Sequence, residues 1–168
     1  DYTINVTVQQ PTPTPSPTPT CQPDPMEPND TALQAGLWAW PYTTFITTSL
    51  SICPNDVDWF SVRLGAQDTL KADIEFLHSE GDLNMQLYYN DDPIRTSDST
   101  TDDEHIEYQS PSDDFYYVKV YHATPGGQNR NYDLQLQVVA PTPTPTPTPT
   151  APPFVCPPDE PKVDLELW

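Results

Sequence analysis

The sequence has very few basic residues. Its 168 residues include six Lys plus Arg against 25 Asp plus Glu, which gives a formal net charge of -19 at pH 7. Nucleic-acid binding needs clustered cations that neutralise phosphates, so this composition argues against a nucleic-acid partner. An anionic membrane surface is disfavoured for the same reason. Such an acidic surface attracts cations such as calcium, although solubility alone would also account for the charge.

Long apolar runs are also missing. No stretch approaches the roughly 18 consecutive apolar residues of a membrane span, and no basic residue precedes an apolar segment as in a signal peptide. We therefore expect no direct membrane insertion. The chain opens within a strand-like pattern, which indicates a mature or excised piece whose targeting signal lies upstream. We expect an extracellular protein, either secreted or on the cell surface.

Motifs for catalysis are absent as well. His78, His105 and His122 show neither HExxH nor CxxC spacing, so we expect three unrelated surface histidines and no zinc site. There is no GxSxG motif and no serine or cysteine nucleophile with an assigned base. Acidic runs such as 102–104 are typical of solvated loops. The sequence therefore predicts a protein that is not an enzyme.

Proline, in contrast, is abundant and concentrated in two low-complexity runs. Most of the 23 prolines lie in residues 11–20 and 141–153, where they alternate mainly with threonine. Such runs favour extended polyproline II spacers of about 3.1 Å per residue. Residues 21–140 are left as the folded domain. The spacers are either bare or O-glycosylated, and the candidate threonines are Thr12, Thr14, Thr18, Thr142, Thr144, Thr146 and Thr148.

The segments around the two proline runs resemble each other. Tyr2 and Tyr132 begin similar strand-like segments at an offset of 130 residues, and a Cys-x-Pro-Asp tetrapeptide follows each run, at Cys21 and at Cys156. This pattern predicts a tandem array whose period is one domain plus one linker. Residues 1–10 are then the terminal strand of a preceding repeat, or an exchanged strand. Residues 154–168 begin a following repeat or domain.

Between the two runs, hydrophobic residues recur with a period of two. The alternation is clearest in residues 70–76 and 83–89, and β-rich composition marks 43–52, 58–64, 105–109, 115–121 and 132–138. Seven or eight short strands without a convincing amphipathic helix predict an all-β antiparallel sandwich or barrel. Residues 27–36 form one helical turn or a loop. We expect the aromatic core to include Trp59, Phe60, Phe76, Phe115 and Tyr117.

Two of the three cysteines are placed to form a disulfide. Cys21 and Cys53 lie on either side of the first long strand, and a bond between them would close a loop of 32 residues. Such a bond fits an oxidising compartment. Cys156 would then belong to the same bridge in the next unit, which explains the odd count better than a reactive thiol does.

Several motifs together resemble one known family. They are the opening Glu27-Pro28-Asn29-Asp30-Thr31, the segment Asn55-Asp56-Val57-Asp58-Trp59-Phe60, and the strands at 82–88, 115–121 and 131–136. Over residues 24–138 the sequence resembles the bacterial pre-peptidase C-terminal domain, which is related to the collagen-binding domains of collagenases. The resemblance implies a jelly-roll-like β-sandwich without catalytic residues.

The resemblance also implies a calcium site, because the collagen-binding relatives carry calcium near the N-terminal edge of the domain. The matching candidate ligands are Glu27, Asn29, Asp30, Asn55, Asp56 and Asp58. This chain departs from the pattern at Pro25, where the family has a further acidic ligand. The alternative is that these side chains satisfy backbone amides in turns without a metal. Asn5 and Asn29 are also candidate N-glycosylation sites, and a glycan on Asn29 would exclude a metal there.

We expect a non-catalytic structural or adhesive repeat of a surface or filament-forming protein, whose partners are neighbouring copies or domains. The alternative is an accessory domain that holds a secreted protease or other hydrolase on its substrate, which could be an extracellular polymer or protein. A candidate aromatic binding surface for that role comprises Trp38, Trp40, Tyr42 and Tyr88.

Overall fold

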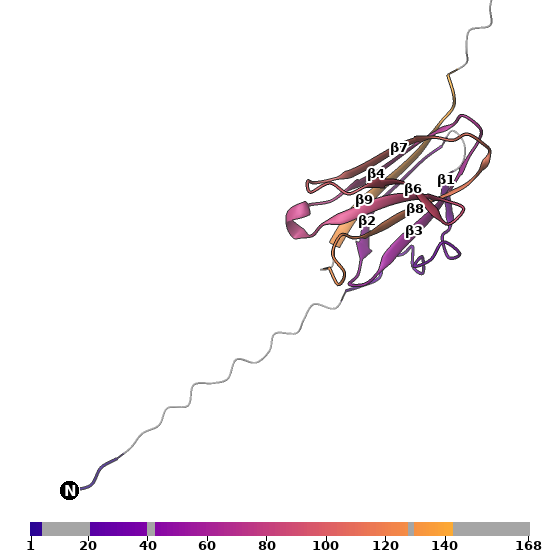
Figure 1. Ribbon diagram of the computed structural model, residues 1–168. Helices are drawn as coiled ribbons and strands as arrows, with labels where there is room; N and C mark the ends of the chain where they lie inside the picture. The colour runs from indigo at the N-terminus through magenta and orange to yellow at the C-terminus, as the bar shows by residue number, and fades with distance from the viewer. Residues whose placement is uncertain (5–20, 40–42, 128–129, 143–168) are drawn as a thin grey trace, which may run out of the picture.

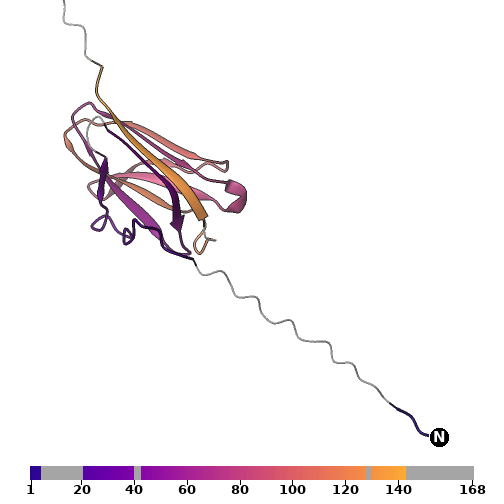
Figure 2. The ribbon, with the colours of Figure 1, turned by 180° about the vertical axis from the view of Figure 1, so that it is seen from behind.

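Two β-sheets packed face to face form the domain. The computed structural model describes residues 1–4, 21–39, 43–127 and 130–142. Within these residues the strands form a five-stranded sheet in the order β1-β3-β8-β5-β6 and a four-stranded sheet in the order β2-β9-β4-β7. Figures 1 and 2 show the two layers from opposite sides. The predicted all-β sandwich is confirmed.

The strand bounds are close to those expected from the period-two pattern. The first sheet contains β1 (Leu37–Ala39), β3 (Val57–Leu64), β5 (Leu83–Tyr89), β6 (Asp92–Ser97) and β8 (Asp114–His122). The second contains β2 (Thr44–Ile52), β4 (Thr69–Glu75), β7 (Glu104–Gln109) and β9 (Arg130–Val139). A 3-10 turn, η1 (His78–Glu80), follows β4. Among the described residues there is no helix long and apolar enough to span a membrane.

Most connections pass from one sheet to the other, as a jelly-roll-like arrangement requires. Among the described strands, β5 and β6 are the consecutive pair that stays within one sheet. Asn90 and Asp91 turn this hairpin with φ angles of 50° and 65°, in the left-handed region that short polar residues tolerate. The described strand pairs are antiparallel apart from β1 with β3, which are parallel.

Inward-facing side chains from both sheets fill the core. The alternation is strict on β4, where Leu70, Ala72 and Ile74 are fully buried. Phe60 and Phe76 are buried as expected. The other three aromatics assigned to the core are not buried there: Trp59, Phe115 and Tyr117 lie partly exposed at the outward positions of the first sheet. Each precedes or follows a buried residue by one position, so its side chain points to the opposite face.

The sequence did not predict β1 and β6. β1 has three residues, too few for a recognisable alternation. β6 begins with Asp92 and Pro93, which read as part of the preceding turn, and it exposes most of its residues because it forms an edge of the sheet. Residues 31–35 make a single turn in which the Ala35 N–H donates to the Thr31 carbonyl at 3.1 Å.

A disulfide fastens the beginning of the domain to the end of β2. Cys21 and Cys53 are joined, as the sequence predicts, with their Cα atoms 5.7 Å apart. Nearby, Asp24 accepts a hydrogen bond from the Ser51 N–H at 2.9 Å, and Ser51 Oγ donates to the Gln22 carbonyl. The segment after Cys21 is therefore held by a covalent bond and by side-chain hydrogen bonds.

Removing the disulfide should destabilise the domain. Closing a loop of 32 residues restricts the unfolded chain, which corresponds to about 3 to 4 kcal/mol. We expect the Cys21→Ser/Cys53→Ser variant to lower the free energy of unfolding by this amount in urea titrations. The wild type with dithiothreitol should match the variant. Equal stability of the variant and the oxidised wild type would contradict this expectation.

Candidate metal centre at the acidic edge

Three carboxylates from separate parts of the chain meet at one end of the sandwich. Glu27 comes from the N-terminal loop, Asp56 from the turn after β2, and Asp58 from β3. Each offers an oxygen that lies within 4.8 Å of those from the other two. Among the described residues this is the group of acidic, histidine or cysteine side chains close enough to hold a metal ion together. We call these three residues the acidic edge.

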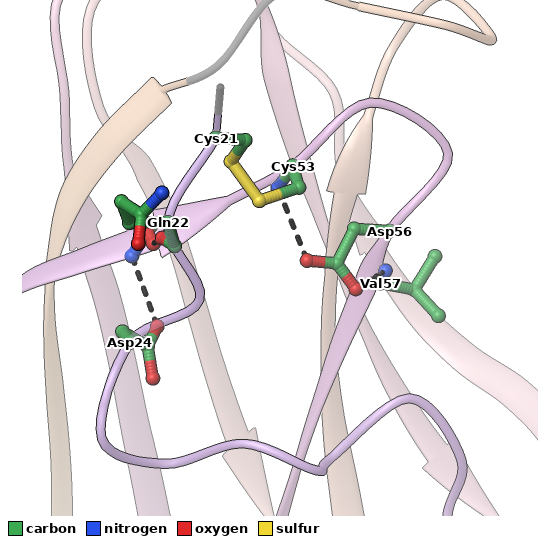
Figure 3. Close-up of a disulfide and its surroundings, with 7 residues drawn as sticks. Cys21, Gln22, Asp24, Cys53, Asp56 and Val57 are labelled. Atoms are coloured by element: carbon green, nitrogen blue, oxygen red, sulfur yellow. Dashed lines mark hydrogen bonds between the residues drawn. A yellow bond between two sulfur atoms is a disulfide. The ribbon is translucent and has the colours of Figure 1, made fainter.

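The turn between β2 and β3 fixes the position of Asp56. Asn55 has a φ of 67°, which bends the backbone sharply before Asp56. The Asp56 carboxylate accepts hydrogen bonds from the Cys53 N–H at 3.0 Å and the Val57 N–H at 2.8 Å (Figure 3). One oxygen is used in each bond, and each carboxylate oxygen has a further lone pair. The disulfide partner Cys53 and the acidic edge thus share one turn.

Asp58 is the deepest member of the acidic edge. Its side chain is fully buried, and its Oδ2 accepts a hydrogen bond of 2.5 Å from the Tyr132 hydroxyl of β9. No Lys or Arg in the described part of the chain lies within ion-pair distance of it. The pKa of Asp58 is raised to about 8, chiefly because burial disfavours the charged carboxylate; the charge of Asp56 adds to the shift and the hydrogen bond from Tyr132 opposes it.

Glu27 and Asn29 close the cluster from the N-terminal loop. Asn29 is 1% exposed, and its carbonyl accepts a hydrogen bond from the Trp59 N–H, which attaches the loop to β3. Glu27 Oε2 accepts the Asn29 backbone N–H at 3.0 Å. Burial raises the pKa of Glu27, and that hydrogen bond partly offsets the rise. The Asn29 side chain is also directed at the carboxylates, with one amide atom 3.0 Å from Glu27 Oε2 and 3.3 Å from Asp58 Oδ1.

The donor set of the acidic edge fits a hard divalent cation such as Ca²⁺. Calcium binds six to eight oxygens from carboxylates, amides and carbonyls, and the three carboxylates and the Asn29 amide provide ligands of this kind. Without a cation, the Asn29 amide satisfies the carboxylates by turning its nitrogen toward Glu27 and Asp58. With a cation, the amide oxygen would face inward. The Asn29 amide therefore fits the cluster both with and without a bound cation. A bound ion would also neutralise the buried charge of Asp58.

The remaining predicted ligands lie at the margin of the acidic edge. Asp30 is exposed, and a hydrogen bond shared with Asp56 raises its pKa. Asn55 is exposed and lines a neighbouring hollow with Tyr121. The sequence reasoning did not single out Asp24, whose negative charge contributes to the raised pKa of both Glu27 and Asp58. The sequence offered one signal for Asp24: it lies three residues before Glu27 and next to Pro25, where the chain departs from the family pattern.

The two described residues of the predicted aromatic surface, Trp38 and Tyr88, have different surroundings. Trp38 packs against the core with its ring centroid 5.3 Å from that of Phe45, whereas Tyr88 contacts Trp59 on the outward face of the first sheet. Trp40 and Tyr42 lie outside the described residues. The same holds for the candidate glycosylation sites Asn5, Thr12, Thr14, Thr18, Thr144, Thr146 and Thr148, and for Cys156. Thr142 is described and exposed. The burial of Asn29 favours its place in the cluster over a glycan.

The three histidines are separate, but one of them is not on the surface. His105 pairs with Asp73 at 2.6 Å, and His78 lies 3.4 Å from Asp82. His122 is 9% exposed, which corrects its assignment as a surface residue. The loop after β8 packs over the His122 ring so closely that a Cβ on Gly127 would lie 2.4 Å from its Nδ1.

The fold and the acidic edge define a disulfide-linked, jelly-roll-like β-sandwich module. Residues 56–122 match the family model of the bacterial pre-peptidase C-terminal domain, which confirms the predicted resemblance. The family consists of non-catalytic accessory domains. The matched range contains Asp56 and Asp58 but not Glu27, Asn29 or Asp30. No curated protein matches the sequence.

Solved structures similar to this chain are remote in sequence. One is the periplasmic inhibitor of g-type lysozyme, PliG, from Aeromonas hydrophila, at 13% identity, 61% coverage of this chain, 96% of that chain and a TM-score of 0.47. Another is the pre-peptidase C-terminal domain of collagenase from Bacillus anthracis, which is 12% identical, with 61% of this chain and 96% of that chain covered and a TM-score of 0.46. PliG from Salmonella Typhimurium is 14% identical, with 61% of this chain and 99% of that chain covered and a TM-score of 0.42.

The buried carboxyl of Asp58 should make stability depend on pH in the absence of calcium. Its folded pKa of about 8 lies above the unfolded value near 3.8, so the folded state retains a proton that the unfolded state has lost. In EDTA the free energy of unfolding should therefore fall as the pH rises from 5 to 8, by at most about 1.4 kcal/mol per pH unit.

The isosteric Asp58→Asn variant should abolish this slope, because the amide stays neutral and can still accept the Tyr132 hydroxyl. Urea titrations at several pH values measure the effect. Asp92→Asn, which removes an exposed carboxylate on β6, serves as the matched control and should keep the wild-type slope. A wild-type profile that is flat between pH 5 and 8 would show that Asp58 does not hold its proton.

Proposed function

We propose that this chain is a non-catalytic extracellular module whose sandwich is stabilised by calcium at the acidic edge. The observation that carries the proposal is the buried Asp58, which lies beside Glu27 and Asp56 and has no cationic partner in the described part of the chain. A buried charge is normally paired, protonated or bound to a metal. A divalent cation would let all three carboxylates remain ionised at neutral pH.

The proposed location is supported by the chemistry of the chain. The Cys21–Cys53 disulfide fits an oxidising compartment outside the cytoplasm. Extracellular calcium is abundant enough to occupy sites of millimolar affinity, which are typical of extracellular modules. The strong negative charge would concentrate that cation near the domain.

Within this class, we favour a structural or adhesive repeat. The similar segments before the two proline-threonine runs, and the Cys-x-Pro-Asp tetrapeptide after each run, support a tandem array of linked sandwiches in a surface or filament-forming protein. Neighbouring copies would then be the main partners. The second candidate, an accessory domain of a secreted hydrolase, is favoured by the family match. Determining whether the full-length product also encodes a catalytic domain separates the two.

Calcium should stabilise the chain in a manner that depends on the acidic edge. At free calcium a hundredfold above the dissociation constant, the free energy of unfolding should rise by about 2.7 kcal/mol over the value in EDTA. Thermal or urea unfolding monitored by circular dichroism measures this change. An identical stability in calcium and in EDTA would refute the metal centre.

Two double variants with the same change in charge locate the effect. Glu27→Gln/Asp56→Asn should remove the response to calcium because two of the three clustered carboxylates are lost. Glu80→Gln/Asp92→Asn, which alters exposed acids elsewhere, should respond like the wild type. If both double variants lose the response equally, calcium acts by general charge screening and not at the acidic edge.

A further inference from the structure

The outward face of the five-stranded sheet carries an unusual concentration of aromatic rings. Its central strands β3, β8 and β5 lie side by side (Figure 1). Buried residues alternate along these strands with partly or fully exposed ones, and five of the latter are aromatic. We call this surface the aromatic face; its rings are those of Trp59, Tyr88, Phe115, Tyr117 and Tyr121.

Two rings of the aromatic face are in direct contact, and Lys119 lies over one of them and over a third ring. Trp59 of β3 reaches across β8 to Tyr88 of β5, with ring centroids 4.9 Å apart. The ammonium of Lys119 lies 5.4 Å from the Trp59 ring centroid and 5.1 Å from that of Tyr121. Tyr117 pairs with Tyr88 in the strand register. Trp59, Tyr88, Tyr121 and Lys119 are therefore linked by contacts, and these rings remain partly exposed.

Charge is distributed unequally between the two outward faces of the sandwich. None of the outward positions on β3, β5 and β8 is acidic, although the protein has 25 Asp plus Glu. The outward face of the other sheet carries Asp73, Glu75, Glu107 and Asp133. On the aromatic face, Arg63 pairs with Asp113 at its border, and Lys119 contacts rings instead of a carboxylate in the described part of the chain.

Amide side chains lie among the rings. Gln86 accepts a hydrogen bond from the Tyr88 hydroxyl at 3.0 Å. Asn84 is hydrogen-bonded to Tyr121, and among the described residues its Oδ1 has no partner. By contrast, Val57 is the one aliphatic side chain at the outward positions of β3, β5 and β8. Apart from the rings, this face therefore presents mainly amide, hydroxyl and cationic groups.

A hollow adjoins the aromatic face at the end nearest the acidic edge. It has a volume of about 260 Å³ and is lined in part by Lys119 and Tyr121 of β8, by Val57 of β3 and by the turn residues Asn55 and Asp56. Its lining thus shares Tyr121 with the aromatic face and also provides hydrogen-bonding groups. A ligand that extends along the face could place one unit in the hollow and stack further units on the rings.

We propose that the aromatic face binds a neutral polysaccharide. Pyranose rings have apolar C–H faces that stack on aromatic side chains and hydroxyl groups that hydrogen-bond to amides, so the mixture of rings and amides matches their chemistry. The charge distribution selects a neutral chain: the net charge of -19 repels polyanions, and Lys119 and Arg63 disfavour a cationic ligand at this face. This inference deepens the proposed function and rests on the chain being a non-catalytic extracellular module.

The test is isothermal titration of the full chain with neutral hexasaccharides. The probes are cellohexaose, xylohexaose, mannohexaose and chitohexaose, and the comparison ligands are hexagalacturonate and a (Pro-Thr)5 peptide. At least one neutral probe should bind. Tyr88→Ala/Tyr117→Ala should weaken that binding about tenfold or more, since two stacking rings are lost. Tyr2→Ala removes a ring that is 89% exposed outside the sheet and should change nothing.

Folding and metal binding are controlled in the same experiment. Equal melting temperatures of the variants show that the loss is not unfolding, and Trp59→Phe, which retains a ring, should bind more tightly than the double alanine variant. Titrations in calcium and in EDTA separate this proposal from the metal centre, because either can fail while the other holds. The proposal is overturned if none of the four neutral probes binds at millimolar concentration, if the double variant binds like the wild type, or if only hexagalacturonate or the peptide binds.

Discussion

The burial of Asp58 between the two sheets is the constraint on which the acidic edge depends. Asp58 belongs to β3 and its hydrogen-bond partner Tyr132 to β9, so this hydrogen bond runs from one sheet to the other. Its carboxyl group is desolvated beside Glu27 and Asp56, and a charge in that position must be neutralised. A proton and a divalent cation both achieve this. Only the cation does so while leaving all three carboxylates ionised, which supports the proposal of calcium as the stabilising partner.

The N-terminal loop is held by several weak contacts together with one covalent bond. Asp24 accepts the Ser51 N–H, Asn29 accepts the Trp59 N–H, and the Cys21–Cys53 disulfide closes the loop at its base. Because the disulfide limits how far the loop can move when it detaches, Glu27 and Asn29 remain near Asp58. The entropic cost of assembling a metal site from distant segments is thereby reduced. The disulfide and the acidic edge thus both hold the N-terminal loop against the end of the sandwich.

Much of the fold follows from the period-two pattern, and the main error has a physical cause. The alternation on β4 and β5 is unbroken, so both strands were predictable. In β3, Trp59 and Phe60 are adjacent, and either could begin the buried set. Trp59 belongs to the core if Asp58 is expected to face solvent. In fact Asp58 is buried, which places Phe60 inside and Trp59 outside. The buried acid of the site thus also decides which side chains of β3 face the core, and it places Trp59 on the aromatic face.

The turn between β2 and β3 connects the two candidate sites. Asp56 belongs to the acidic edge and, with its neighbours Asn55 and Val57, also lines the hollow beside the aromatic face. The Asp56 carboxylate already binds the backbone of this turn through Cys53 and Val57. A cation that fixes Asp56 would therefore also fix the wall of the hollow, and its loss would leave that wall free to rearrange. Such coupling is reciprocal, so a ligand that orders the turn would favour the cation in return. In the proposed calcium-bound state, the ion would therefore also order the end of the aromatic face that lies nearest the N-terminal loop.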